Sequence, residues 1–207
     1  FNTTEITIDS RIAPNDKYFK SGFYRYFVTT KYPVFLCTLT AGFLNRNSHV
    51  SNYQKVSVGA KQRLSWQGGH TRYQVQYSKI FGTSPYPFSY VTSASFGVIF
   101  DNYIFNMLKE FEFVTDQNVS LYLEHHFDGL LFNKIPLFNK LKLREIIYFR
   151  VLWGNYSAQN ASLIIPPADV KSPSKIPYME ASFGIENILN VFRLDFMWLL
   201  TYRNTPG

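Results

Sequence analysis

The chain has 207 residues, of which 46% are hydrophobic and 18% aromatic, and its formal net charge is +7. That length and hydrophobic content are sufficient for one domain. Its Lys and Arg residues are scattered rather than gathered into a patch, which argues against nucleic-acid binding. The single Cys37 excludes an internal disulfide and a cysteine-based zinc site, and no run of about 18 apolar residues is present to form a spanning helix.

Apolar and polar residues alternate with a period of two in nine segments, which predicts β-strands that each have one apolar face. In chain order these segments are residues 4–11, 33–43, 53–66, 70–79, 102–114, 122–129, 144–156, 178–185 and 192–202. Helical periodicity is weak throughout, and only PLFNKLKL at 136–143 predicts one short turn of helix. The sequence therefore predicts an all-β fold, arranged as an antiparallel meander of about nine strands.

The connections between these strands differ in length. WQGGHT at 66–71 and VTDQN at 114–118 predict tight hairpin turns, whereas 12–32, 83–101 and 157–176 are longer and rich in Pro, Ser, Asn and Tyr. We expect the short turns at one rim of the sheet and the long loops at the other, as in outer-membrane barrels.

Two all-β folds fit the alternation, namely a soluble sandwich and a transmembrane barrel. Aromatic residues favour the barrel, because several are expected near strand ends on the apolar face, where membrane-interface girdles lie: Trp66, Phe81, Phe113, Trp153, Trp198 and Tyr202. In a barrel, lipid would contact Val56, Val58, Phe149, Phe183, Phe196 and Trp198. We therefore predict an antiparallel transmembrane β-barrel, only part of which lies in this chain.

The stretch YLEHHFDG at 122–129 contains four residues of types that bind metals. On a strand, His125 and His126 point to opposite faces and cannot share an ion, whereas Glu124, His126 and Asp128 share one face. That face could serve as a metal or catalytic site, as a substrate-contacting lining, or as a structural network of charges in the lumen. We favour the structural network and predict no catalytic, cofactor-binding or metal site.

The predicted lumen charge network consists of Glu124, His126, Asp128, Arg144, Arg150, Glu180, Arg193 and Asp195. By parity and strand order, its acidic residues Glu124, Asp128, Glu180 and Asp195 should lie within reach of Arg144, Arg150 or Arg193. These groups should pair because an unpaired charge in a small lumen is costly.

Several long runs of the sequence resemble one family. These are EFEFVTDQNVSLYLEHHFDGLLFNKIPLFNKLKLRE and PYMEASFGIENILNVFRLDFMWLLTYRNTPG, with KIFGTSPYPF and SRIAPNDKYF as shorter stretches. They resemble the carboxyl-terminal barrel of a Bacteroidetes outer-membrane family that carries a carboxypeptidase-like regulatory domain. That barrel is related to the bacterial surface-antigen, or BamA-like, superfamily, and the resemblance implies no peptidase activity.

The resemblance implies a location in the bacterial outer membrane, in contact with lipid and with other outer-membrane proteins. We expect a structural, export-related or envelope-assembly component of a membrane complex, not an enzyme. A small-solute pore or receptor channel is the alternative. An outer-membrane lipid hydrolase is disfavoured because Ser120 and His125, its best-placed histidine, would lie on opposite faces.

We also expect residues 1–207 to be the carboxyl-terminal half to two-thirds of a larger barrel. The regulatory domain and further strands would precede residue 1. The TYRNTPG turn would lead to a closing strand beyond Gly207, because an unclosed sheet leaves unpaired backbone groups in hydrocarbon.

Overall fold

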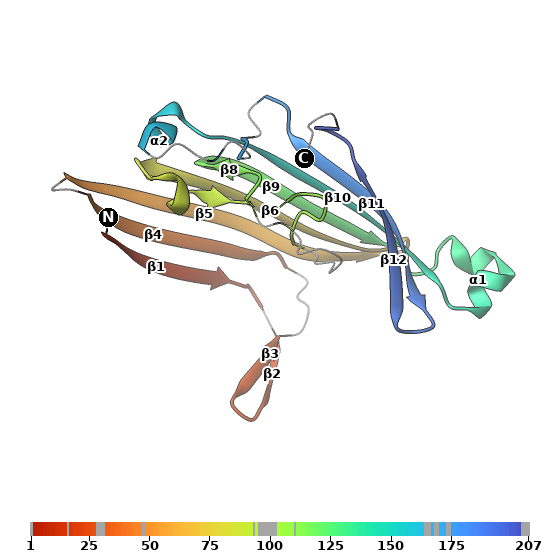
Figure 1. Ribbon diagram of the computed structural model, residues 1–207. Helices are drawn as coiled ribbons and strands as arrows, with labels where there is room; N and C mark the ends of the chain where they lie inside the picture. The colour runs from red at the N-terminus through yellow and green to blue at the C-terminus, as the bar shows by residue number, and fades with distance from the viewer. Residues whose placement is uncertain are drawn as a thin grey trace.

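A computed structural model of the chain describes residues 2–15, 17–27, 32–46, 49–92, 94, 103–109, 111–163, 167, 170–172 and 175–203. Its main element is a long antiparallel sheet of eight strands, which is seen in Figure 1. In spatial order they are β1 (Asn2–Ile12), β4 (Val34–Arg46), β5 (His49–Trp66), β6 (Gly69–Gly82), β9 (Gln117–His126), β10 (Arg144–Asn155), β11 (Tyr178–Ile188) and β12 (Phe192–Leu199). The predicted all-β antiparallel fold is confirmed.

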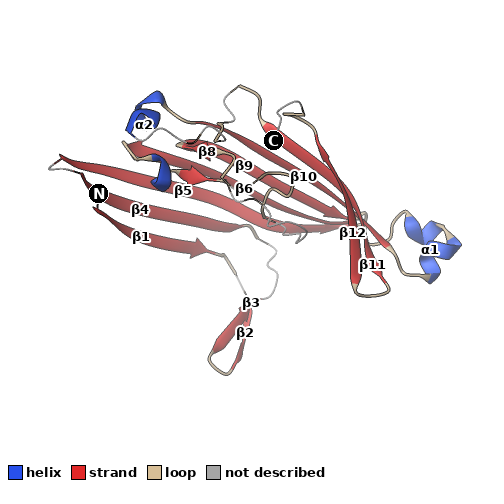
Figure 2. Ribbon diagram, in the orientation of Figure 1, coloured by secondary structure: helices blue, strands red, loops and turns tan. Residues whose placement is uncertain are grey.

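Short elements join these strands, and Figure 2 shows that helices occur only in the connections. They are the hairpin β2 (Tyr18–Ser21) and β3 (Tyr24–Phe27), the pair β7 (Tyr90–Val91) and β8 (Val114–Thr115), the 3-10 helices η1 (Tyr86–Phe88) and η2 (Phe132–Lys134), and the α-helices α1 (Pro136–Lys140) and α2 (Ala158–Leu163). Helix α1 confirms the helical turn predicted at 136–143. Among the described residues, no helix has the length and hydropathy needed to span a bilayer.

The strand predicted at 102–114 is wrong. Described residues of this segment form turns, bends and two isolated β-bridges at Phe105 and Phe113, and only Val114 belongs to a strand. A turn interrupts the alternation at Lys109, because the Glu112 carboxylate accepts a hydrogen bond from the Lys109 amide at 3.2 Å. The segment instead folds over the sheet, so β6 pairs directly with β9.

The expected separation of short turns and long loops is also wrong. The rim at the carboxyl end of β5 has the tight turn at 67–68, as predicted from WQGGHT, but also the long connections at 13–33 and 127–143. VTDQN does not form a hairpin turn. Asp116 is the single residue between β8 and β9, and its backbone makes hydrogen bonds with the backbones of Ile80 and Asn155. Both rims therefore mix short and long connections.

A buried side-chain cluster joins two of these connections at the opposite rim. Asp116 accepts hydrogen bonds from the Ser157 amide and the Asn160 side-chain amide, each at 2.8 Å. Asn160 in turn accepts one from the Ser84 amide at 3.0 Å. The long connections after β6 and after β10 are thus fixed to one another and to the start of β9.

One face of the sheet, here called the apolar face, has exposed hydrophobic side chains on seven of the eight strands, and those of β11 are half-buried. Its exposed side chains include Ile6, Ile8, Phe35, Leu39, Val58, Leu64, Val75, Leu123, Ile147, Leu194 and Phe196. Val58 is 43% exposed and Trp198 52%, whereas Val56, Phe149 and Phe183 are half-buried on the same face. These five residues and Phe196 therefore share one face, as the alternation predicted.

The other face, here called the polar face, contains most of the buried polar residues of the sheet. They include Thr40, Ser57, His70, Ser78, Ser120, Glu124, His126, Arg150, Glu180 and Ser182. This burial pattern is the reverse of that in a water-soluble sheet, in which the apolar face is covered and the polar face exposed.

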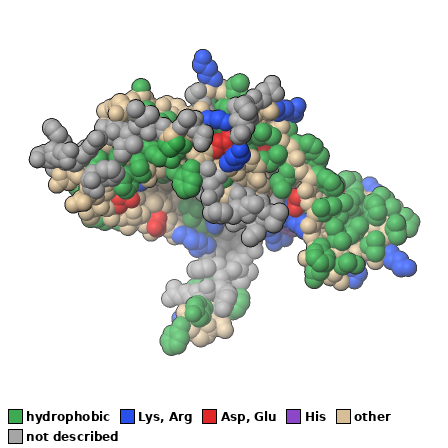
Figure 3. Space-filling model, viewed as in Figure 1, with side chains coloured by type: hydrophobic (Ala, Val, Ile, Leu, Met, Phe, Trp, Pro, Cys, Tyr) green, Lys and Arg blue, Asp and Glu red, His purple; other side chains and the backbone are tan. Residues whose placement is uncertain are grey.

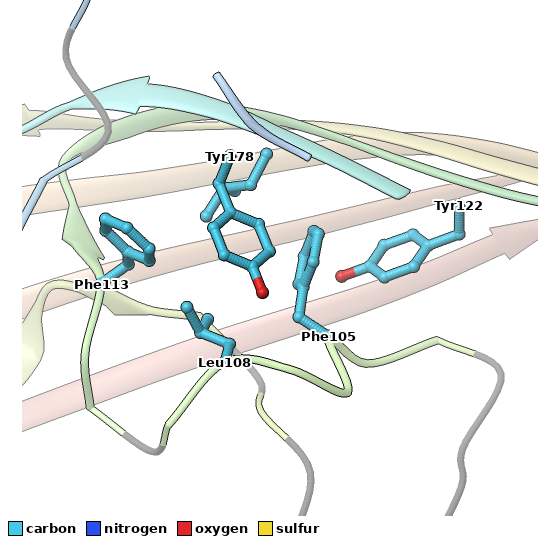
Figure 4. Close-up of a cluster of buried hydrophobic side chains, with 6 residues drawn as sticks. Phe105, Leu108, Phe113, Tyr122 and Tyr178 are labelled. Atoms are coloured by element: carbon cyan, nitrogen blue, oxygen red, sulfur yellow. The ribbon is translucent and has the colours of Figure 1, made fainter. Parts of the chain in front are cut away.

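Residues 103–109 and 111–113 cover part of the polar face. Phe105, Leu108 and Phe113 pack against Tyr122 of β9 and Tyr178 of β11, as Figure 4 shows. Phe105 and Phe113 are fully buried, and the Tyr202 ring lies 5.5 Å from the Phe113 ring.

Phe113 and Tyr202 were expected in an aromatic girdle on the apolar face, and that expectation is wrong. The predicted girdle residues Trp66, Phe81, Trp153 and Trp198 are exposed.

The sheet does not close on itself within the described residues. Strand β1 pairs only with β4, and β12 pairs only with β11. Each of these edge strands therefore presents backbone N–H and C=O groups on its other side. The turn expected at Asn204–Gly207 lies outside the described residues.

A close contact between β4 and β5 generates a testable prediction. The buried Tyr53 ring lies over Gly42, where a β-carbon would overlap it, and the Tyr53 hydroxyl donates to Glu5 at 2.7 Å. Substituting Gly42→Ala should lower the free energy of unfolding by about 2 kcal/mol through overpacking. Denaturant titration measures this cost. In a Tyr53→Ala background the same substitution should have almost no effect, and an equal cost in both backgrounds would contradict the proposed overlap.

Candidate functional site

Charged side chains of the polar face gather in two places along β9, β10 and β11. Antiparallel register puts Arg72 opposite Glu124, His70 opposite His126, and Arg150 opposite Glu180. Directly opposite residues have β-carbons roughly 5 Å apart, so long charged side chains at these positions can meet. We call the first group, near the end of β9, the rim cluster, and the second, at mid-sheet, the central pair.

The central pair is Arg150 and Glu180, whose charged atoms lie 2.8 Å apart. Both side chains are almost completely buried, with 2% and 5% of their surface exposed. Glu180 also accepts hydrogen bonds from the Tyr178 hydroxyl and from the backbone amides of Asn106 and Met107, at 2.9–3.0 Å. The central pair therefore fixes the covering segment 103–113 to the sheet.

The rim cluster centres on His126 and Glu124. Arg72 donates to Glu124 at 3.0 Å, and the Nε2 atom of His126 contacts the same carboxylate. The Nδ1 atom of His126 lies 3.1 Å from Glu186. Both ring nitrogens of His126 thus face carboxylate oxygens, and only a doubly protonated ring can donate to both. In that form two cations balance two anions.

His70 extends the rim cluster toward the following turn. Its ring stacks on that of His126 with centroids 4.3 Å apart, and its Nδ1 atom lies 2.9 Å from Asp128. Asp128 was predicted to lie on the strand, and that prediction is wrong. Strand β9 ends at His126, and Asp128 adopts a left-handed backbone conformation with φ of 52°. Burial of its carboxyl opposes ionisation, but the hydrogen bond from His70 and the charges of His70 and Arg144 hold the pKa of Asp128 below its ordinary value.

Arg193 and Asp195 form an ion pair within β12, at 2.7 Å. The Arg193 guanidinium also lies over the ring of Tyr148, 4.7 Å from its centroid, and Arg150 lies over the same ring at 5.2 Å. Tyr148 therefore links the central pair to the charges of β12 by cation–π contacts.

All eight residues of the predicted network lie in or beside these groups. Arg150 pairs with Glu180, Arg193 with Asp195, and Arg144 approaches Asp128 at 4.0 Å. Glu124 differs from expectation, since its arginine partner at hydrogen-bond distance is Arg72 of β6.

Sequence reasoning missed four members of this arrangement, namely His70, Arg72, Tyr148 and Glu186. The alternation in segment 70–79 puts Arg72 on the face opposite to Tyr73 and Val75, which is the polar face. However, a strand expected at 102–114 would have separated β6 from β9 and kept Arg72 away from Glu124. Because one strand too many was predicted, the contact between Arg72 and Glu124 was not predicted.

Ser120 and His125, the serine and histidine considered for a hydrolase, lie on opposite faces of the sheet. His125 packs between the rings of Trp66 and Phe127 on the apolar face and contacts the Thr71 hydroxyl at 2.9 Å. Ser120 is buried on the polar face. Within the described ranges, no group of three or more His, Cys, Asp or Glu residues is arranged to hold a metal ion.

A groove of about 490 Å³ lies on the apolar face. It is lined by Val75, Val119, Leu121, Val151, Trp153, Lys175 and Pro177. Its lining is almost entirely hydrophobic, so the groove is suited to hydrocarbon rather than to a polar substrate.

Comparison with known protein families matches residues 1–161 to the C-terminal domain of a family of unknown function, DUF5686. The chain belongs to this family. No curated protein and no solved structure matches the chain. Family membership therefore assigns no activity to the rim cluster or to the central pair, and their geometry is the guide to their role.

The burial of the central pair generates the next prediction. Replacing Arg150 with leucine leaves the buried Glu180 carboxylate without its cation and should lower the free energy of unfolding by about 3 kcal/mol. Arg144→Leu is a matched control, because Arg144 is half-exposed and its contact with Asp128 is long; it should cost less than about 1 kcal/mol. Thermal or denaturant unfolding distinguishes the variants, and an unchanged midpoint for Arg150→Leu would show the pairing to be incidental.

The lowered pKa of Asp128 predicts a contribution to acid stability. Because the carboxyl ionises more readily in the folded state, its contribution is present at neutral pH and is lost as the pH falls below about 4. Asp128→Asn should reduce this part of the acid dependence. Solvent exposure of Asp128 keeps the effect small. If the unmodified protein and Asp128→Asn lose stability equally between pH 7 and pH 3, the ionised Asp128 carboxylate does not stabilise the fold.

Proposed function

We propose that this domain is part of the wall of a bacterial outer-membrane β-barrel, with its apolar face toward lipid and its polar face toward a filled lumen. In this role the domain is a scaffold within an envelope complex and performs no catalysis. A structural, export-related or envelope-assembly function fits a sheet of this kind.

The observation that carries the proposal is the reversed burial of the two faces. Large hydrophobic side chains are exposed on seven of the eight strands of the main sheet, all but β11, while most of the buried charged and hydroxyl side chains of the sheet lie on the other face. Each Å² of apolar surface left in water costs about 25 cal/mol, so an apolar face that is exposed on seven strands is unfavourable in water. In hydrocarbon the same face is favourable, which supports a lipid environment.

The filling of the polar face favours a scaffold over an open pore. Segment 103–113 lies against the polar face and is held by its aromatic contacts and by Glu180. The nearby charges of Arg150, Arg193 and Asp195 are already paired. A water-filled channel would instead leave such groups solvated. A pore is the second candidate, and the observation in its favour is the polar character of this face.

The two edge strands of the sheet, β1 and β12, support the proposal that the domain is part of a larger barrel. Within the part of the chain that the structure describes, β1 and β12 each pair on one side only, and in a bilayer the other side of each would need hydrogen-bonding partners. We propose that strands outside these 207 residues supply them, so that this domain forms part of a larger barrel. The Bacteroidetes origin, the regulatory domain and the relation to the surface-antigen superfamily belong to the same proposal and rest on the sequence resemblance alone, since the matched family is one of unknown function.

Conductance in planar bilayers tests the filled-lumen proposal. The full-length protein should show no steady conductance, whereas Phe105→Asp combined with Phe113→Asp should open a channel, because buried carboxylates would expel the covering segment. Phe111→Asp is the control, since Phe111 is exposed on the same segment and its substitution should leave the bilayer sealed. Steady conductance of the unmodified protein would overturn the scaffold and favour the pore.

A further inference from the structure

The connection between β9 and β10, here called the β9–β10 arm (residues 127–143), projects beyond the rim of the sheet. It contains η2 and α1, and Figure 1 shows it as a separate extension. Five of its large aliphatic side chains are exposed by 44–62%: Leu130, Leu131, Ile135, Leu137 and Leu141. Figure 3 shows hydrophobic side chains gathered over this extension, with basic side chains at its margin.

The arm is also basic. Lys134, Lys140 and Lys142 are exposed, and the sequence has no acidic residue between Asp128 and Glu145. Exposed leucines interspersed with lysines are typical of segments that lie in the interfacial layer of a membrane. There, aliphatic groups enter the acyl boundary and lysines extend to the headgroups.

Contacts with β10 place the arm on the apolar-face side of the rim. Glu145 lies opposite Ile185 and on the same face as Ile147, and its fully buried carboxylate accepts a hydrogen bond from the Phe132 amide. The arm is further fixed by Asn187, whose side-chain amide donates to the Lys142 carbonyl at 2.8 Å. Its exposed leucines are therefore held beside the face that we assign to lipid.

We propose that the β9–β10 arm binds the headgroup region of an anionic lipid leaflet. In this arrangement the leucines insert at the edge of the acyl layer and the three lysines pair with lipid phosphates. The positive charge of the arm selects anionic lipid over a neutral surface, and the aliphatic side chains fix its depth. This inference rests on the proposed function, since it requires the apolar face to be in the membrane.

Site-specific fluorescence tests the proposal on the full-length protein. In a Cys37→Ser background, an environment-sensitive dye is attached at Leu137→Cys on the arm or at Val58→Cys on the apolar face. The protein is reconstituted in phosphatidylcholine vesicles with or without phosphatidylglycerol. Emission wavelength, quenching by spin-labelled lipid and quenching by iodide in the water phase are then measured.

The Val58→Cys dye should be protected from iodide in both kinds of vesicle. The Leu137→Cys dye should be quenched by shallow spin labels, and phosphatidylglycerol should reduce its iodide quenching by about tenfold, as three lysine–lipid contacts permit. Charge reversal by Lys134→Glu, Lys140→Glu and Lys142→Glu should abolish this lipid dependence without changing the Val58→Cys signal.

Two results would overturn the inference, and they are distinguishable. If the Val58→Cys dye is protected while the Leu137→Cys dye is quenched freely by iodide in both kinds of vesicle, the sheet is in lipid but the arm is not, and only the inference fails. If the Val58→Cys dye is itself freely quenched by iodide, the apolar face is in water. The proposed function and the inference then fail together.

Discussion

A buried carboxylate must be satisfied by donors, and in this domain that constraint acts through Glu180. Its donors come from the strand opposite, from its own strand and from the segment that crosses the polar face. Because no single element supplies them all, the sheet and its covering segment stabilise one another. The aromatic cluster around Phe105 and Tyr178 then fills the space beside this carboxylate. The polar face is therefore an interior built from charge as well as from rings.

The alternation of residue types was sufficient to predict most of the sheet. A period of two is a local property, so the faces of Val58, Phe149, Arg150 and Glu180 followed directly from the sequence. Strand pairing is not local, and it depends on which segments are available to lie side by side. The segment at 102–114 has enough alternation to resemble a strand, but its aromatic residues gain more by packing on Tyr122 and Tyr178 than by pairing at an edge.

The strand that was wrongly predicted at 102–114 explains why the contacts among the charged groups were only partly predicted. The central pair joins β10 and β11, which are consecutive in the main sheet, so it could be expected from parity alone. The contact between Arg72 and Glu124 joins strands separated by a long connection, and it required the correct neighbour for β9. The stacking of His70 on His126 depends on the same register. Asp128 was assigned to a strand, but the Phe127–Gly129 turn, with its left-handed Asp128 and Gly129, ends the strand first.

The exposed apolar face constrains the order of events by which the domain reaches its folded state. Pairing of strands creates a broad hydrophobic surface at the same moment that it buries the charges of the polar face. In water that surface would associate with any other apolar surface, including the same face of a second molecule. In the outer-membrane setting that we propose, the sheet would be covered as it forms and not afterwards, and the unfolded chain would be protected until it reaches hydrocarbon. Delivery of the chain and assembly of the sheet are, for such a domain, a single coupled process.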